Sequence, residues 1–316
     1  MTNNLENIPF DAVISTSGES YEQFRKSLTP RYSQAWRHIL LATILLLIPF
    51  ITYLFLPTTW RWLLLPVCVC YIGYLIAFLH LFIHEAAHFN LHPDKKTNDR
   101  LATYILCVFF GITLKEYRKI HWTHHLHLAT PEDAEISYFT PVNYKYFVRI
   151  LTGAQVLSVI RTRKKGNSSE NSPASSTGIL LLTFGVHLVL LIAAWYCGSY
   201  PLVLGWILAV TIVFPLLATL RQILEHRADD AAKDPHYYQH QVRARSSRLF
   251  ENNLFSTTFG GAGFNRHMIH HWDPQISYTR IDDVISFLEQ SPATAFIIQQ
   301  SKTSYSKVFL RLSGLK

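Results

Sequence analysis

The amino-acid sequence predicts an all-α integral membrane protein with four transmembrane helices in two hairpins, further re-entrant or interfacial helices, and a cytoplasmic histidine-rich cap. Three observations support this fold class. Hydrophobic residues make up 49% of the 316 residues and gather in four long uncharged runs. Basic residues are almost absent from the short links that join those runs in pairs. Histidines cluster next to the ends of the runs.

The four apolar runs are 18 to 22 residues long and contain no Asp, Glu, Lys or Arg. A helix of about 20 apolar residues crosses the hydrocarbon core of a bilayer. Prolines inside three of the runs do not argue against helices, because membrane helices tolerate proline better than soluble helices do. The predicted transmembrane helices are residues 39–56, 62–83, 178–197 and 201–220.

The other segments complete a single predicted membrane domain over residues 1–316. The apolar stretch 101–114 would be about 21 Å long as a helix, which is too short to cross a bilayer, so we expect it to be re-entrant or interfacial. Residues 161–177 change from basic residues to Ser, Asn, Pro and Gly, which is typical of a flexible linker. Residues 1–37 and 221–316 are predicted to form cytoplasmic N-terminal and C-terminal regions.

The distribution of charge predicts the orientation in the membrane. Of the 29 Lys and Arg residues, only Arg61 lies in a short link between two runs. If the runs cross as two hairpins, the other basic residues all face one side. The positive-inside rule then places both termini and the histidine clusters in the cytoplasm. The same distribution accounts for the net charge of +8, so nucleic-acid binding is not expected.

Eight histidines form three clusters, each beside a predicted membrane boundary. HEAAH at 84–88 places two imidazoles one helical turn apart, and HWTHH at 121–125 and HMIHH at 267–271 share the pattern H-x-x-H-H. Residues i, i+3 and i+4 lie on one face of a helix, so each cluster directs its imidazoles toward one point. The candidate metal ligands are His84, His88, His121, His124, His125, His267, His270 and His271.

The number of imidazoles and their setting indicate the metal. A catalytic zinc takes about three protein ligands, so eight imidazoles suggest two metal ions. Imidazole binds zinc, copper, iron and nickel, and ligand type alone leaves the metal open. A site at the mouth of a lipid-facing bundle favours an alkyl substrate, and attack on its C–H bonds requires an O2-derived oxidant that the cofactor carries. We therefore infer two iron ions, with O2 as co-substrate.

Taken together, the three clusters resemble the histidine boxes of the membrane-bound fatty acid desaturase and hydroxylase family. The resemblance runs from about His80 to Pro274 and includes HEAAHFNLHPDKKTND, HWTHHLHLATPEDAE and NRHMIHHWDP. It implies an oxidoreductase that desaturates or hydroxylates the alkyl chain of a fatty acid or lipid. Desaturation and hydroxylation both stay open, because they share the oxidant.

The resemblance also implies a ninth ligand and several supporting groups. The family uses a histidine at the cytoplasmic end of its last membrane helix, and His226 matches that position. Gln222, one turn earlier, matches an amide that in some members reaches the metal region through water, although members commonly have Asn there. Acidic residues next to the clusters are expected to orient the ligand imidazoles. They are Glu85, Asp133, Glu135 and Asp273.

The expected partners follow from the same resemblance. Some members carry a fused cytochrome b5 domain with a His-Pro-Gly-Gly motif, where this chain has only His92-Pro93-Asp94. We therefore expect electrons from a separate ferredoxin-, rubredoxin- or cytochrome b5-like protein. The other expected partners are a fatty acyl or lipid substrate and the membrane lipids.

Two other classes of protein compete with this interpretation. The HEAAH sequence fits the H-E-x-x-H signature of zinc proteases, in which Glu85 would be the general base, but that reading leaves the other two clusters unexplained. A metal transporter places ionisable ligands near the bilayer midplane, whereas here only His187 lies in the middle of a run. An intramembrane zinc metalloprotease using His84, Glu85 and His88 is retained as the alternative.

Overall fold

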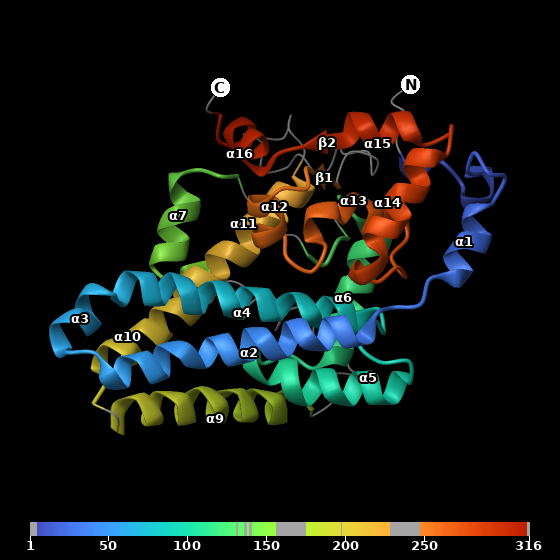
Figure 1. Cartoon of the computed structure of the whole chain (residues 1–316). Helices are drawn as coiled ribbons and strands as arrows, with labels where there is room; N and C mark the ends of the chain where they lie inside the picture. The colour runs from blue at the N-terminus through green and yellow to red at the C-terminus, as the bar shows by residue number, and fades with distance from the viewer. Residues whose placement is uncertain are drawn as a thin grey trace. The chain divides into compact units, whose positions relative to one another are not determined.

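The computed structural model describes residues 5–130, 132–135, 138, 141–155, 175–196, 198–227 and 247–314. These residues are mostly helical (Figure 1), and their only paired strands are β1 (Leu249–Phe250) and β2 (Lys302–Thr303), which run parallel. The chain divides into two compact units, each built from segments that are far apart in the sequence. Unit 1 comprises Met1–Ala35, Lys119–Val142 and Leu220–Lys316, and unit 2 comprises Trp36–Arg118 and Asn143–Thr219.

Unit 2 contains the long apolar helices. In chain order its helices are α2 (Tyr32–Phe55), α3 (Thr58–Leu63), α4 (Leu65–Ala87), α5 (Lys95–Leu101), the π-helix η3 (Ala102–Leu106), η4 (Cys107–Phe109), α7 (Tyr144–Leu151), α9 (Ser175–Tyr196), α10 (Tyr200–Leu208) and the π-helix η6 (Ala209–Val213). The boundary between the units falls inside α2 and inside two further helices. These are α6 (Leu114–His127) and α11 (Phe214–His226).

Among the described residues, four helices are long and apolar enough to cross a membrane, and each overlaps one of the four predicted spans. They are Tyr32–Phe55, Leu65–Ala87, Thr177–Tyr196 and Tyr200–His226. Large apolar side chains on these helices are exposed, among them Phe55 at 82% and Leu181 at 68%. A contiguous apolar surface is unfavourable in water, so these faces are suited to contact with lipid. The second and fourth helices also extend past their uncharged runs, into the residues that carry His84 and His226.

Close packing inside unit 2 depends on small residues. α4 contacts both α10 and η6, and a Cβ atom at Gly73 of α4 would overlap the Val213 side chain. Small residues let membrane helices approach one another closely, where van der Waals packing supplies the attraction. Gly73 therefore sets the approach of α4 to η6.

His187, the central histidine of α9, forms one hydrogen bond through each of its two ring nitrogens. Nε2 of His187 is 3.1 Å from the Phe109 carbonyl oxygen, and Nδ1 accepts from Nε1 of Trp206 at 3.0 Å. A neutral ring with its proton on Nε2 satisfies both contacts. His187 thereby ties α9 to η4 and to α10.

The stretch 101–114 does not form one continuous helix. α5 leads into η3 and η4, the chain turns at Gly111 with a φ of 61°, and α6 begins at Leu114. Among the described residues, none of the four candidate spans includes this stretch. The result agrees with the expectation that it does not cross, and its re-entrant or interfacial position stays a prediction.

Unit 1 has a core that joins the N-terminal residues to the C-terminal region. Its helices are η1 (Leu5–Asn7), η2 (Phe10–Ala12), α1 (Tyr21–Ser27), α12 (Leu254–Phe259), η10 (Phe264–Arg266), α13 (His267–Trp272), η11 (Tyr278–Arg280), α14 (Ile281–Gln290), α15 (Ala295–Ser301) and α16 (Tyr305–Ser313). The ring of Trp272 lies 4.7 Å from that of Phe10 and 4.6 Å from that of Tyr21, measured between centroids. This aromatic cluster anchors α13, the helix that carries the third histidine cluster.

Several predictions concern features beyond these helices. The pairing of the spans as two hairpins, the cytoplasmic orientation and the single domain over residues 1–316 stay predictions. The predicted linker 161–177 lies mostly outside the described residues, and its last three residues belong to α9.

Candidate metal centre

The first histidine cluster lies at the C-terminal end of α4, in unit 2. His84 and His88 are both buried, and their ring centroids are 5.0 Å apart, as the one-turn spacing predicts. Glu85 is also buried, and its Oε1 lies 3.6 Å from Nδ1 of His84. The carboxylate is therefore beside the imidazole that it was predicted to orient.

The second cluster lies in the C-terminal half of α6. A reciprocal cap starts this helix: Glu116 Oε2 accepts from the Thr113 backbone N–H, and the Glu116 N–H donates to Thr113 Oγ1. His121 and His124 are buried, and His125 is half-buried. The chain leaves α6 through Ala129, whose left-handed φ of 63° begins the turn toward the acidic residues that follow.

The third cluster occupies α13, and His226 ends α11. Gly263 precedes η10 and α13 with a φ of 80°, and a Cβ atom there would lie 2.8 Å from the Cβ atom of Tyr278. Only glycine fits this left-handed turn. Nε2 of His267 lies 2.9 Å from Nε2 of His226 and 3.1 Å from Nε2 of His271. His226 therefore lies with the third cluster, although it is 41 residues before His267.

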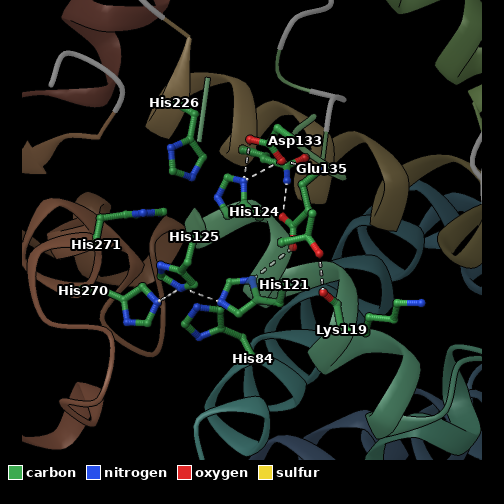
Figure 2. A network of polar contacts seen from close by, with 12 residues as sticks. His84, Lys119, His121, His124, His125, Asp133, Glu135, His226, His270 and His271 are labelled. Atoms are coloured by element: carbon green, nitrogen blue, oxygen red, sulfur yellow. Dashed lines mark hydrogen bonds and ion pairs between the residues drawn. The ribbon is translucent and has the colours of Figure 1, made fainter. Parts of the chain in front are cut away.

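In unit 1, imidazole nitrogens from α6, α11 and α13 converge (Figure 2). Nε2 of His125 is 3.0 Å from Nε2 of His121 and 3.0 Å from Nε2 of His270. The ring centroids of His125 and His271 are 4.6 Å apart, so this trio adjoins a second set. The second set has ligand atoms that all lie within 4.8 Å of one another and consists of His124, His226, His267 and His271.

Carboxylates fix the orientation of two of these rings. Nδ1 of His121 is 3.1 Å from Oε1 of Glu135, and Nδ1 of His124 is 2.9 Å from Oδ2 of Asp133 (Figure 2). A carboxylate accepts a hydrogen bond, so Nδ1 carries the proton in each ring and Nε2 keeps its lone pair. This is the tautomer in which Nε2 binds a metal ion. Asp133 and Glu135 thus contact imidazoles of the second cluster, and their role at a metal site stays a prediction.

Gln222 holds the Glu135 carboxylate that contacts His121. Its Nε2 donates a hydrogen bond of 2.6 Å to Oε2 of Glu135, the carboxylate whose other oxygen faces His121. Gln222 therefore acts on the histidine cluster through a carboxylate in this structure. The predicted water-mediated path to the metal stays a prediction.

The electrostatic environment shifts the pKa values of the histidines in different directions. Burial lowers the pKa of His124, but the carboxylates of Glu135 and Asp133 outweigh it and raise that pKa above its ordinary value. Burial and the neighbouring imidazoles lower the pKa of His271 well below its ordinary value. Burial and the Arg118 guanidinium lower the pKa of His88 to about 3. His88 and His271 are therefore neutral near pH 7, the form that binds a metal ion.

The carboxylate of Asp273 has other partners. Asp273 is the C-cap residue of α13, and its oxygens accept from the Tyr21 hydroxyl at 3.0 Å, from the Arg25 guanidinium and from the Gln275 N–H. The contacts with Tyr21 and Arg25 join it to α1, 248 residues away at Arg25. Its predicted role in orienting the third cluster stays a prediction.

Sequence reasoning missed two buried or half-buried partners of the acidic residues. Tyr138 donates to Asp133 at 2.6 Å and accepts from the Ala129 N–H at 2.7 Å, so it holds the carboxylate behind His124. Arg25 pairs with Asp273 at the end of α13. Tyr138 lies close enough to the second cluster in the sequence to have been suspected. Nothing in the sequence around Arg25 points to α13.

The donor set of unit 1 fits divalent metal ions. Nε2 of His125 faces two other Nε2 atoms, and so does Nε2 of His267. One ring nitrogen carries at most one proton, so mutual hydrogen bonds cannot satisfy such a convergence of neutral rings. A cation accepts the lone pairs of all of them at once. Neutral imidazoles backed by carboxylates are the donors that iron and zinc sites use.

Helices that suit a bilayer, together with a buried histidine-rich centre, indicate a membrane protein whose histidines could hold metal ions. The model of the fatty acid desaturase family matches residues 60–293, which include every histidine of the three clusters and His226. The chain belongs to the fatty acid desaturase family, whose members are oxidoreductases. No curated protein matches the chain. The family match gives no support to the zinc-protease alternative.

Proposed function

We propose that the protein is a di-iron oxidoreductase that uses O2 to desaturate or hydroxylate the alkyl chain of a fatty acid or lipid. Membership of the desaturase family supports the class of reaction. The observation that carries the metal assignment is the convergence of seven imidazoles in unit 1, with carboxylates behind His121 and His124. Two bound iron ions would supply the O2-derived oxidant that attack on an unactivated C–H bond requires.

The proposed ligands come from all three clusters. Unit 1 supplies the seven histidines whose Nε2 atoms converge. His84 and His88 join the set because the family pattern places the first box at the metal, and their burial and low pKa suit neutral ligands. The full set is His84, His88, His121, His124, His125, His226, His267, His270 and His271.

The protein's own residues then have three tasks. Asp133 and Glu135 hold the Nδ1 protons of His124 and His121 and keep the facing nitrogens free to bind. Five of the seven unit 1 ligands are buried and the other two are half-buried, which limits competition from water. The four apolar helices give the alkyl chain an environment of the same polarity as the bilayer.

The proposal also covers the substrate, the electron donor and the orientation in the membrane. The substrate is a fatty acyl chain or lipid drawn from the membrane. Electrons come from a ferredoxin-, rubredoxin- or cytochrome b5-like donor protein. The distribution of basic residues supports an orientation with both termini and the metal site in the cytoplasm.

Metal analysis tests the proposal directly. We expect protein purified with iron supplied to contain about two irons per chain, since the ligand set exceeds what one ion takes. Cells with and without the gene should differ in unsaturated or hydroxylated acyl chains when their lipids are compared by gas chromatography and mass spectrometry. One stoichiometric zinc, with lipid products insensitive to iron chelators, would overturn it.

A pair of histidine variants assigns the least obvious ligand. His226→Ala should lose product and bound iron, because its Nε2 lies 2.9 Å from that of His267. The matched control is His127→Ala, an exposed histidine at the end of α6 that should leave both quantities unchanged. If His226→Ala retains the product level and iron content of the control, His226 is not a ligand.

A further inference from the structure

We propose that Arg118 and Phe89 together hold the C-terminal end of α4 in the shape that presents His88, and so position the first histidine cluster. The inference rests on the proposed metal site for its functional meaning. The structural part concerns unit 2 alone, to which α4, α5 and Arg118 belong.

The end of α4 has a well-defined hydrogen-bond pattern. His88 is the C-cap residue, the Phe89 N–H donates to the Ala86 carbonyl at 3.1 Å, and the Asn90 N–H donates to the Glu85 carbonyl at 3.0 Å. These two bonds define a Schellman motif, which requires a left-handed residue directly after the C-cap. Phe89 occupies that place with a φ of 62°.

An aromatic residue is an unusual choice for this position. Glycine adopts the left-handed conformation without steric cost, whereas the Cβ atom of any other residue crowds the following carbonyl group. A strained residue of this kind persists only where the surrounding structure determines its conformation. The end of α4 therefore needs support from the residues around it.

Arg118 provides that support with its whole side chain. The guanidinium carbon lies 4.0 Å from the centroid of the Phe89 ring. Nε donates to the Ala87 carbonyl at 2.9 Å, and Nη2 donates to the Ala86 carbonyl at 3.1 Å. The last carbonyls of a helix have no i+4 partner, so the Nε bond satisfies the Ala87 carbonyl, while the Nη2 bond adds to the bond that the Ala86 carbonyl accepts from the Phe89 N–H.

An ion pair with α5 holds the Arg118 guanidinium in place. Nη1 and Nη2 of Arg118 form a two-point ion pair with Asp99, at 2.8 and 2.6 Å. The neighbouring Asn98 is fully buried, donates to the Ala86 carbonyl at 3.0 Å and accepts from the Leu91 N–H at 3.1 Å. We call the contacts of Arg118 with Phe89, Ala86 and Ala87 the clamp. Asp99 of α5 holds the Arg118 guanidinium, and Asn98 binds the backbone before and after Phe89, at Ala86 and Leu91.

The clamp surrounds a proposed ligand. His88 lies between Ala87, whose carbonyl is bound by Arg118, and Phe89, whose ring is covered by it. A change in the backbone at either neighbour rotates the Cα–Cβ bond of His88 and moves its imidazole. Arg118 is therefore a positioning residue that acts through the helix end. Lysine cannot replace it, because an ammonium group lacks the planar fork that binds two carbonyls and a carboxylate together.

Arg118→Lys is the first test variant. We expect its iron affinity to fall about 10- to 100-fold, the range for changes that disturb ligand orientation without removing a ligand. With Co2+ bound in place of iron, the visible absorption spectrum should shift from that of the wild type. In metal-free protein, the Phe89 and Asn90 amides should exchange with solvent at least tenfold faster, because Arg118 no longer stabilises the bonds that protect them. The matched control is Arg100→Lys on the exposed side of α5, which should change none of these readouts.

A second substitution distinguishes positioning from a general effect on folding. Phe89→Gly removes the strain at the left-handed residue, so the helix end no longer needs the clamp. The double variant Arg118→Lys with Phe89→Gly should recover most of the amide protection and iron affinity that Arg118→Lys loses. Asp99→Asn, which weakens the anchor but leaves Arg118, should give a loss of the same kind but smaller.

The outcomes separate this inference from the proposed function. Unchanged amide exchange in Arg118→Lys, or no recovery in the double variant, overturns the inference whatever the metal content. A wild-type protein that binds no iron or cobalt, with the predicted exchange pattern intact, overturns the metal site and leaves the clamp of α4 standing.

Discussion

At the scale of single residues, the candidate metal centre includes groups that orient the proposed ligands without being ligands themselves. Gln222, Glu135 and His121 form one chain of hydrogen bonds, and Tyr138, Asp133 and His124 form another. Each chain ends at an imidazole whose Nδ1 is occupied, so Nε2 is the nitrogen left for binding. Two neighbouring histidines of α6 thereby have their tautomers fixed by the loop that follows the helix.

Asp133→Asn tests the importance of this fixation. The carboxylate accepts from His124, Tyr138 and the Glu135 N–H, and an amide cannot accept all three while one of its two groups is a donor. We expect iron affinity to fall about 10- to 100-fold. Metal titration followed by elemental analysis measures the change. Glu132→Gln makes the same chemical change at an exposed neighbour and should bind iron like the wild type; equal affinities in both variants would contradict the assigned role of Asp133.

The low pKa of His88 predicts how the iron-free protein responds to acid. Between about pH 6.5, the ordinary pKa of histidine, and about pH 3, the unfolded chain binds a proton at this residue that the folded chain does not. Stability therefore falls as pH falls through this window. The midpoint of thermal unfolding in detergent should drop accordingly, and His88→Asn should flatten the dependence. A midpoint in His88→Asn that falls as steeply as in the wild type would show that other groups cause the loss.

At the scale of elements, hydropathy predicts the apolar helices well and their ends poorly. Four uncharged runs suffice to locate the apolar helices, because hydrocarbon excludes charge strongly. Hydropathy does not show that α4 continues to Ala87 or that the last apolar helix continues to His226. The one-turn spacing of HEAAH and the resemblance at His226 predicted both extensions. The sequence also could not predict the hydrogen-bond partners of Asp273. Arg25 is 248 residues away, and only the folded core of unit 1 brings α1 to α13.

His187 provides a test at this scale, because its two hydrogen bonds join three elements. In His187→Leu, the Trp206 indole N–H and the Phe109 carbonyl each lose a partner in an apolar setting. We expect a loss of roughly 1–3 kcal/mol in stability, about the cost of leaving such groups unsatisfied. A lower thermal midpoint with unchanged iron content would support the structural role. Loss of iron at an unchanged midpoint would instead connect His187 to the metal site. His127→Leu, at the exposed end of α6, is the matched control.

At the scale of the whole molecule, the proposed function requires the histidine clusters to share one side of the membrane. If the four spans form two hairpins, the chain returns to the same side of the membrane after the second span and again after the fourth. A fifth crossing at residues 101–114 would separate the first cluster from the second. The break of that stretch into η3, η4 and the turn at Gly111, each too short to span a bilayer, supports four crossings.

Cysteine labelling decides the topology. In a variant without the native cysteines, single cysteines at Thr59, in the link before α4, and at Tyr200, after α9, should react with a membrane-impermeant maleimide added to intact cells. Cysteines at Ser17, near the N-terminus, and at Lys115, at the start of α6, should react only after the membrane is opened, because the positive-inside rule predicts that these segments are cytoplasmic. Ser17 and Lys115 are the informative pair, since they stand on either side of the first two spans and the stretch 101–114. Labelling of Lys115 from outside while Ser17 stays protected would mean that 101–114 crosses, would place His84 and His121 on opposite faces, and would exclude a metal site made from all three clusters.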